Sequence, residues 1–147
     1  RREELTTQGG LDAPRQPERL REGLERLKRA GVRTSLFIDP DPGAVRRSHD
    51  LGANAIELHT GTYADHPGNP ATLRALANAA ELARALGLAV HAGHGLTVRN
   101  VGPVAAIASV EELNIGHSIV SRAIFVGLPQ SIAEMREAMT VARGAAR

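Results

Sequence analysis

The sequence contains no cysteine, no apolar run of transmembrane length and no large excess of charge of one sign. The absence of cysteine excludes disulfides and thiolate metal sites, and it is compatible with a reducing cytoplasm. A membrane-spanning helix needs about 20 consecutive apolar residues, so we expect no membrane role. With 42% hydrophobic and 23% charged residues, the chain has the composition of a soluble globular protein.

The basic pI of about 9.9 raises the possibility of nucleic-acid binding, but the charge pattern argues against it. The formal net charge is only +2, and nearly every cation is arginine, so few groups titrate between neutral pH and the arginine pKa. Arginines and glutamates alternate near the N-terminus, as at Arg19, Glu22 and Arg26. Such alternation is typical of a solvated helix face, and we expect no nucleic-acid partner.

Short apolar segments alternate with amphipathic ones along the chain. The strands are predicted at residues 34–39, 55–58, 88–95 and 112–116. Helical spacing of apolar residues predicts helices around 20–27, 44–51, 70–86 and 101–108, a short segment at 118–126, and a closing helix. The closing helix is expected to place Leu128, Ile132, Met135 and Met139 on one side, and residues 59–69 are expected to form a polar loop.

This alternation predicts an α/β fold built from four parallel βα units. Thr60, His94 and His117 follow the carboxyl ends of strands, where barrel enzymes carry their chemistry, although open doubly wound sheets bind ligands there too. We favour a TIM-type (β/α)8 barrel. Because a complete barrel normally needs about 250 residues, we expect residues 1–147 to be its C-terminal half and the chain to be a fragment.

A phosphate site is predicted at the segment Asn114 to Ser118, where a strand ends in glycine and a helix follows. Backbone N–H groups at a helix start bind phosphate, Gly116 lets the backbone approach the anion, and His117 adds a donor. The alternative is a tight turn with a surface histidine.

The string HAGHGLT, at residues 91–97, contains two histidines that suit either proton transfer or metal ligation. If the strand persists, its alternation points His91 and His94 to opposite sides, and the flanking glycines favour His94 as the functional residue. A structural, hydrogen-bonded histidine is the alternative. A metal site formed by the histidines at the strand ends is discounted, because no aspartate accompanies them at a matching strand end.

Glu57 lies within the apolar strand AIEL. A carboxylate facing a barrel interior costs several kcal/mol unless it is paired, so its presence indicates a function or a partner. It could stabilise a developing cation or position a water molecule. A salt bridge to an inward arginine is the alternative.

Six strings in order resemble pyridoxine 5'-phosphate synthase of bacterial vitamin B6 biosynthesis. They are LTTQGGLD, SLFIDPD, IELHTGTYAD, HAGHGLT, NVGPVAAI and ELNIGHSIVSRAIFVGL, and they span nearly the whole chain. The resemblance implies a barrel enzyme that condenses 1-deoxy-D-xylulose 5-phosphate with 3-amino-2-oxopropyl phosphate, releasing phosphate and water. It implies no metal or organic cofactor, a cytoplasmic location and a homo-oligomer.

The resemblance also implies residue roles. Thr6 would bind the deoxyxylulose phosphate, and Gly95, Gly116 and His117 would bind the phosphate of the aminoketone. The catalytic residues would be His94, as a proton donor, and Glu57, as a transition-state stabiliser.

The chain departs from the family pattern because further substrate ligands and two proton acceptors, which the family carries on the first barrel strands, are absent. We therefore expect the chain alone to be inactive, and unpaired edges at the first and fourth strands predict that it is unstable or self-associating. Two alternatives stay open: another phosphosugar isomerase or lyase on a similar barrel, and a half-barrel that binds ligands without catalysis.

Overall fold

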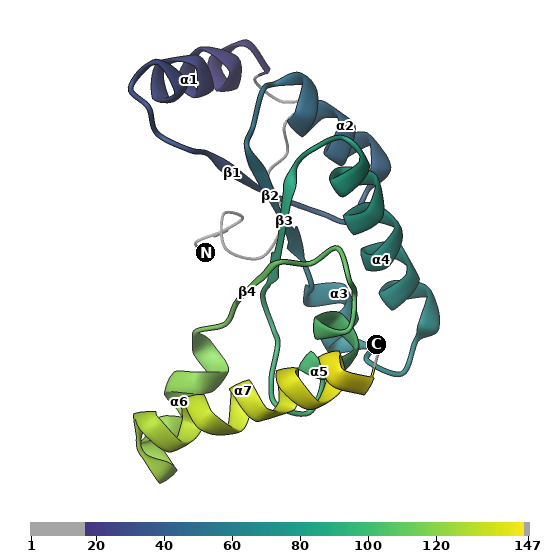
Figure 1. The fold of residues 1–147 in the computed structure, drawn as a ribbon, viewed down its shortest axis with the longest axis vertical. Coiled ribbons are helices and arrows are strands. Elements are labelled where there is room, and N and C mark those ends of the chain that lie inside the picture. Colours follow the sequence, from purple (N-terminus) through teal and green to yellow (C-terminus); the bar gives the residue numbers. More distant parts are fainter. Residues whose placement is uncertain (1–16, 146–147) are drawn as a thin grey trace, which may run out of the picture.

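The computed structural model describes residues 17–145, which form a parallel sheet with helices along one face and at both ends (Figure 1). The strands are β1 (Ser35–Ile38), β2 (Ala55–His59), β3 (Ala89–Gly93) and β4 (Glu112–Asn114). The helices are α1 (Pro17–Arg29), α2 (Pro42–Asp50), α3 (Gly61–Asp65), α4 (Pro70–Ala85), α5 (Val101–Ala105), α6 (His117–Val126) and α7 (Leu128–Ala145).

The order of the strands is that of a barrel and not of a doubly wound sheet. The four strands pair in chain order, β1-β2-β3-β4, and every pairing is parallel. The crossover helices lie on the same face, since α2 contacts α4 and α4 contacts α5. A doubly wound sheet reverses its strand order and carries helices on both faces. The four-stranded sheet is therefore an arc of a TIM-type (β/α)8 barrel, as predicted.

The two faces of the sheet differ in polarity. One row of paired positions, Ile38, Leu58, Ala92 and Leu113, faces the helices, and its first three members are almost fully buried. The adjacent row, Phe37, Glu57, His91 and Glu112, lies on the opposite face and is half-buried or exposed. Because strand side chains alternate between faces, the second row faces the barrel interior.

The core lies between the sheet and α2 and α4. Helix α4 contributes Leu76 and three alanines, all at most 1% exposed, and α2 contributes the fully buried Val45. Both helices begin with a side-chain cap followed by proline: Asp41 accepts from the Ala44 N–H at 2.7 Å, and Asn69 accepts from the Ala71 N–H at 3.0 Å. Such caps satisfy backbone donors that the first turn leaves without partners.

One sequence prediction is wrong in the structure. Residues 59–69 are not only a loop, because they contain the helix α3. On α7, the predicted apolar side is buried only in part: Met135 is 3% exposed, whereas Leu128 and Ile132 are 51% and 40% exposed. The predicted strands at 88–95 and 112–116 are shorter than expected, since β3 ends at Gly93 and β4 at Asn114.

Across residues 17–145, we find no helix with the length and apolar character to cross a membrane.

Candidate functional site

A cavity of about 830 Å³ opens at the carboxyl ends of the strands. It is lined by the end of the sheet, the loop after β3, the start of α6 and parts of α6 and α7. Five of the predicted site residues line it: Glu57, His94, Gly95, Gly116 and His117. Thr6 lies outside the described residues. The tertiary structure thus brings together residues that are up to 60 positions apart in the sequence.

Glu57 lies in the middle of β2 on the interior face, where it pairs in register with Phe37 and His91. Its carboxylate extends over Gly93: a Cβ at position 93 would lie 2.6 Å from Oε1 of Glu57 and 2.7 Å from the carbonyl oxygen of Asn114. Glycine at this position therefore provides the space that the carboxylate occupies. Among residues 17–145, no ion pair of Glu57 with an arginine is seen, so the salt-bridge alternative finds no support there.

His94 follows β3 directly and has a backbone φ of +86°, a left-handed conformation that residues with a Cβ rarely adopt. This turn changes the geometry expected from sequence. Because the strand ends at Gly93, simple alternation does not determine the orientation of His94, which lines the cavity, whereas His91 does not. Positive φ at a non-glycine residue is a strained state that clusters at functional sites.

The position of His59, at the end of β2, is not predicted from the sequence. His59 is 8% exposed, and its ring lies near two others. The His94 ring centroid is 4.6 Å from that of His59, and the Phe37 ring centroid is 5.1 Å away in a T-shaped arrangement. Its Nδ1 lies 3.5 Å from Oδ1 of Asp39. Its Nε2 has no hydrogen-bond partner among the described residues.

The electrostatic surroundings of His59 favour its neutral form. Burial lowers the pKa of the imidazole and nearby His94 lowers it further, while Asp39 and Asp65 act in the opposite direction with smaller effect. A signal for this residue was present in the sequence, because histidine at the end of an apolar strand is unusual. Its partners, however, come from β1 and from the loop after β3, which only the fold brings together.

The predicted phosphate site lies at the start of α6. Gly116 is the N-cap residue, no side chain caps this helix end, and His117 is the first helical residue. The next residue, Ser118, donates its hydroxyl to the carbonyl oxygen of Leu96 at 2.6 Å. This bond ties the start of α6 to the loop that carries His94 and Gly95, so both halves of the cavity are linked.

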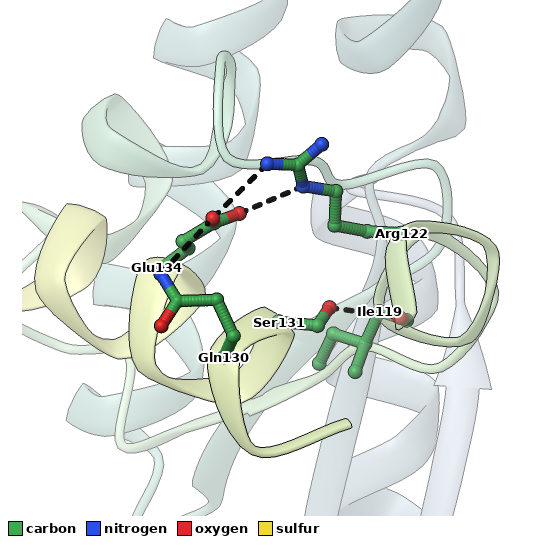
Figure 2. A network of polar contacts seen from close by, with 5 residues as sticks. All are labelled: Ile119, Arg122, Gln130, Ser131 and Glu134. Atoms are coloured by element: carbon green, nitrogen blue, oxygen red, sulfur yellow. Dashed lines mark hydrogen bonds and ion pairs between the residues drawn. The ribbon is translucent and has the colours of Figure 1, made fainter. Parts of the chain in front are cut away.

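Arg99 and Arg122 also line the cavity. Arg122 donates from Nε and one Nη to both carboxylate oxygens of Glu134, at 2.9 and 3.1 Å, and Gln130 donates to the same carboxylate (Figure 2). The hydrogen bond from Arg122 lowers the pKa of Glu134, and that from Gln130 adds to the effect. Together with the bond from the Ser131 hydroxyl to the Ile119 carbonyl, at 2.8 Å, this network joins α6 to α7 (Figure 2).

The described part of the chain contains no group of three or more histidine, aspartate or glutamate side chains placed to hold a metal ion. The histidines at the strand ends do not all share one site: His94 and His117 line the cavity, while His91 and His59 do not, although the rings of His59 and His94 are 4.6 Å apart. What the cavity offers is an imidazole, a carboxylate and a helix start without a side-chain cap among the described residues. Such a set suits acid–base chemistry on an anionic substrate.

The family model and the similar sequences among known proteins point to one family. The chain is 47% identical over 146 residues to pyridoxine 5'-phosphate synthase of Neisseria meningitidis serogroup A. The match covers 97% of this chain and 60% of that protein. It is 52% identical over 142 residues to the enzyme of the same name from Synechococcus sp. strain JA-2-3B'a(2-13), covering 95% and 59%. The chain therefore spans about three fifths of the length of these relatives.

A solved structure shares the fold at low sequence identity. The crystal structure of the Amycolatopsis orientalis BexX/CysO complex matches 86% of this chain and 49% of the compared chain, with a TM-score of 0.60 and 21% identity. The model of the family described as "Pyridoxal phosphate biosynthesis protein PdxJ" matches residues 1–141, and the chain belongs to this family.

Proposed function

We propose that this chain is the C-terminal half of a pyridoxine 5'-phosphate synthase, which condenses 1-deoxy-D-xylulose 5-phosphate with 3-amino-2-oxopropyl phosphate. The observation that carries the proposal is the meeting of His94, Glu57, Gly95, Gly116 and His117 around one cavity, in a chain of this family. An acid, a carboxylate and an anion-binding helix start are the groups that such a condensation requires.

The reaction joins an amine to a carbonyl, eliminates water and phosphate, and closes a ring, so protons move repeatedly. His94 lines the cavity and follows the carboxyl end of β3, where it can donate a proton to a leaving oxygen. Glu57 lies deeper, in the middle of β2. Its carboxylate stabilises positive charge that develops on an iminium-like nitrogen.

The phosphate of the aminoketone binds at the start of α6, to the N–H groups near Gly116, to the His117 side chain, and next to Gly95. Thr6 binds the other substrate, 1-deoxy-D-xylulose 5-phosphate. No metal or organic cofactor enters this proposal, and the cytoplasmic location and homo-oligomeric state stay predictions.

The test uses a hybrid synthase, in which this chain replaces the matching three fifths of the Neisseria meningitidis relative. The unsubstituted hybrid synthase is expected to form pyridoxine 5'-phosphate from the two substrates. The variant His94→Asn is expected to lower kcat by about two to four orders of magnitude, because general acid catalysis contributes that much. Product is followed by chromatography, with His66→Asn, an exposed histidine in the loop after α3, as the matched control.

Turnover of His94→Asn within a few-fold of the hybrid synthase would refute the acid role. Turnover of a different phosphosugar, with none of the proposed pair, would favour an isomerase or lyase instead. Binding of both substrates without turnover would point to a non-catalytic module.

A further inference from the structure

The segment that follows β2 contacts the loop that follows β3 at three points. The Tyr63 hydroxyl donates to the carbonyl oxygen of Asn100 at 2.7 Å, and a Cβ added at Gly95 would lie 2.7 Å from the Cβ of Ala64. The third contact is made by Thr60, between β2 and α3, and it reaches the backbone of His94. The short helix α3 therefore lies against the loop that supplies several residues of the cavity wall.

Thr60 is fully buried and holds two neighbouring carbonyl groups. Its hydroxyl lies 2.7 Å from the carbonyl oxygen of Gly93 and 2.5 Å from that of His94, so that its one proton serves both acceptors. Its backbone N–H also donates to the Gly93 carbonyl, at 2.8 Å. As the N-cap of α3, a threonine would normally accept a hydrogen bond from its own helix, but here no such bond forms.

These two carbonyls belong to the peptide planes before and after the Cα of His94. Fixing both planes fixes φ and ψ of His94, and therefore the direction in which its side chain leaves the backbone. The left-handed φ of +86° is a conformation that the surroundings must maintain, since it is strained for histidine.

We infer that Thr60 is a positioning residue for His94: its buried hydroxyl maintains the left-handed turn that presents the imidazole to the cavity. This inference rests on the proposed function only in what it says about turnover. Thr60 touches neither the cavity nor any reacting group among the described contacts, so it acts through His94.

The test compares three variants in the hybrid synthase. Thr60→Val keeps the shape but removes the hydroxyl, and kcat is expected to fall about 10- to 100-fold with KM nearly unchanged, because a misplaced acid loses that much. Thr60→Ser keeps the hydroxyl and is expected to restore kcat to within about three-fold. Thr62→Val, at an exposed threonine of α3, is the control and is expected to leave kcat and KM unchanged.

A readout without turnover separates this inference from the proposed function. The rings of His59 and His94, with centroids 4.6 Å apart, are expected to give a nuclear Overhauser effect in the hybrid synthase that Thr60→Val weakens and Thr60→Ser retains. If the hybrid synthase forms no product, the proposed function fails, and this measurement still decides the positioning role.

Three results would overturn the inference: unchanged kcat and ring contact in Thr60→Val, an equal loss of kcat in Thr60→Ser, or an effect on KM alone. If Thr60→Val does not fold, Thr60→Cys takes its place, since the thiol is a weak donor of similar size. Its kcat is then expected to lie several-fold below that of Thr60→Ser, and kcat equal to Thr60→Ser would overturn the inference.

Discussion

Helices α4 and α6 are both rich in apolar residues, yet they differ in how much of their apolar surface is buried. Helix α4 buries Leu76, Ala80 and Ala83 against the sheet, each at most 1% exposed. Helix α6 buries none of its residues, and Ile124 and Phe125 are 78% and 80% exposed. Within residues 17–145, buried helix residues thus pack against β1 to β3, whereas the apolar side chains of α6, which follows β4, are exposed or half-buried.

The region that stabilises the fold and the region that forms the cavity are therefore different parts of the molecule. The buried contacts that hold the fold lie on the outer face of the sheet, under α2 and α4. The cavity lies at the other side of the sheet and at its β4 end, where Phe125 and Arg122 belong to its wall. Substitutions in the two regions should therefore have effects of different size and kind.

The largest change in stability is expected from Leu76→Ala in α4. Removing a fully buried leucine side chain leaves a cavity between α4 and the sheet, and it should lower the free energy of unfolding by about 2–5 kcal/mol. Urea unfolding of the hybrid synthase, followed by circular dichroism, measures the loss. The matched control is Leu128→Ala, the same substitution at a side chain that is 51% exposed.

The control is expected to cost less than about 1 kcal/mol. Equal losses for the two variants would mean that the α6–α7 end is as tightly packed in the hybrid synthase as α4. That result would remove the distinction between the two regions.

A smaller effect is expected from pH, through His59. Because burial lowers the pKa of His59 below its ordinary 6.5, the unfolded chain binds a proton more readily than the folded chain. The stability that this histidine confers is therefore complete above pH 6.5 and is lost as the pH falls from 6.5 toward the lowered value. Urea unfolding as a function of pH should show this slope, and His59→Gln, which cannot be protonated, should reduce it.

An unchanged slope in His59→Gln would assign the pH dependence to other groups.

The smallest effect on stability is expected from Phe125→Ser in α6. The side chain is 80% exposed, so the free energy of unfolding should change by no more than about 0.5 kcal/mol. Self-association of the 147-residue chain should weaken, however, because the substitution removes one of the exposed large apolar side chains of α6, which also include Val120 and Ile124.

Size-exclusion chromatography at several protein concentrations measures this association. The strand edges of β1 and β4, each paired on one side only within residues 17–145, are a second source of it. A parent chain that elutes as a monomer at all concentrations would contradict both sources.

The sequence predicted the elements well where the apolar pattern alone decides them. All four strands and α4 appear within a few residues of their expected bounds. The differences from the prediction occur where a partner segment decides the outcome. Helix α3 has five residues, too few for an apolar period, and it is held by Tyr63 and Thr60 through bonds to the loop after β3. The exposure of Leu128 and Ile132 likewise depends on what packs against α7.

The candidate site likewise has residues that could be predicted from the sequence and contacts that could not. Its residues were found from the positions of polar groups at strand ends and from a family resemblance, and those within residues 17–145 line one cavity. The sequence placed Thr60 at a strand end but could not predict its bonds to the Gly93 and His94 carbonyls, because these form only when β3 lies beside β2.

From the sequence by itself follow the alternation of strands and helices, the parallel fold class and the residue types available for chemistry, because periodicity and turn residues act locally. Only the tertiary structure decided which face each strand turns inward, the left-handed turn at His94, the space above Gly93 for the carboxylate of Glu57, and the burial of His59. Each of these depends on contacts between segments that are distant in the chain, and no local pattern encodes them.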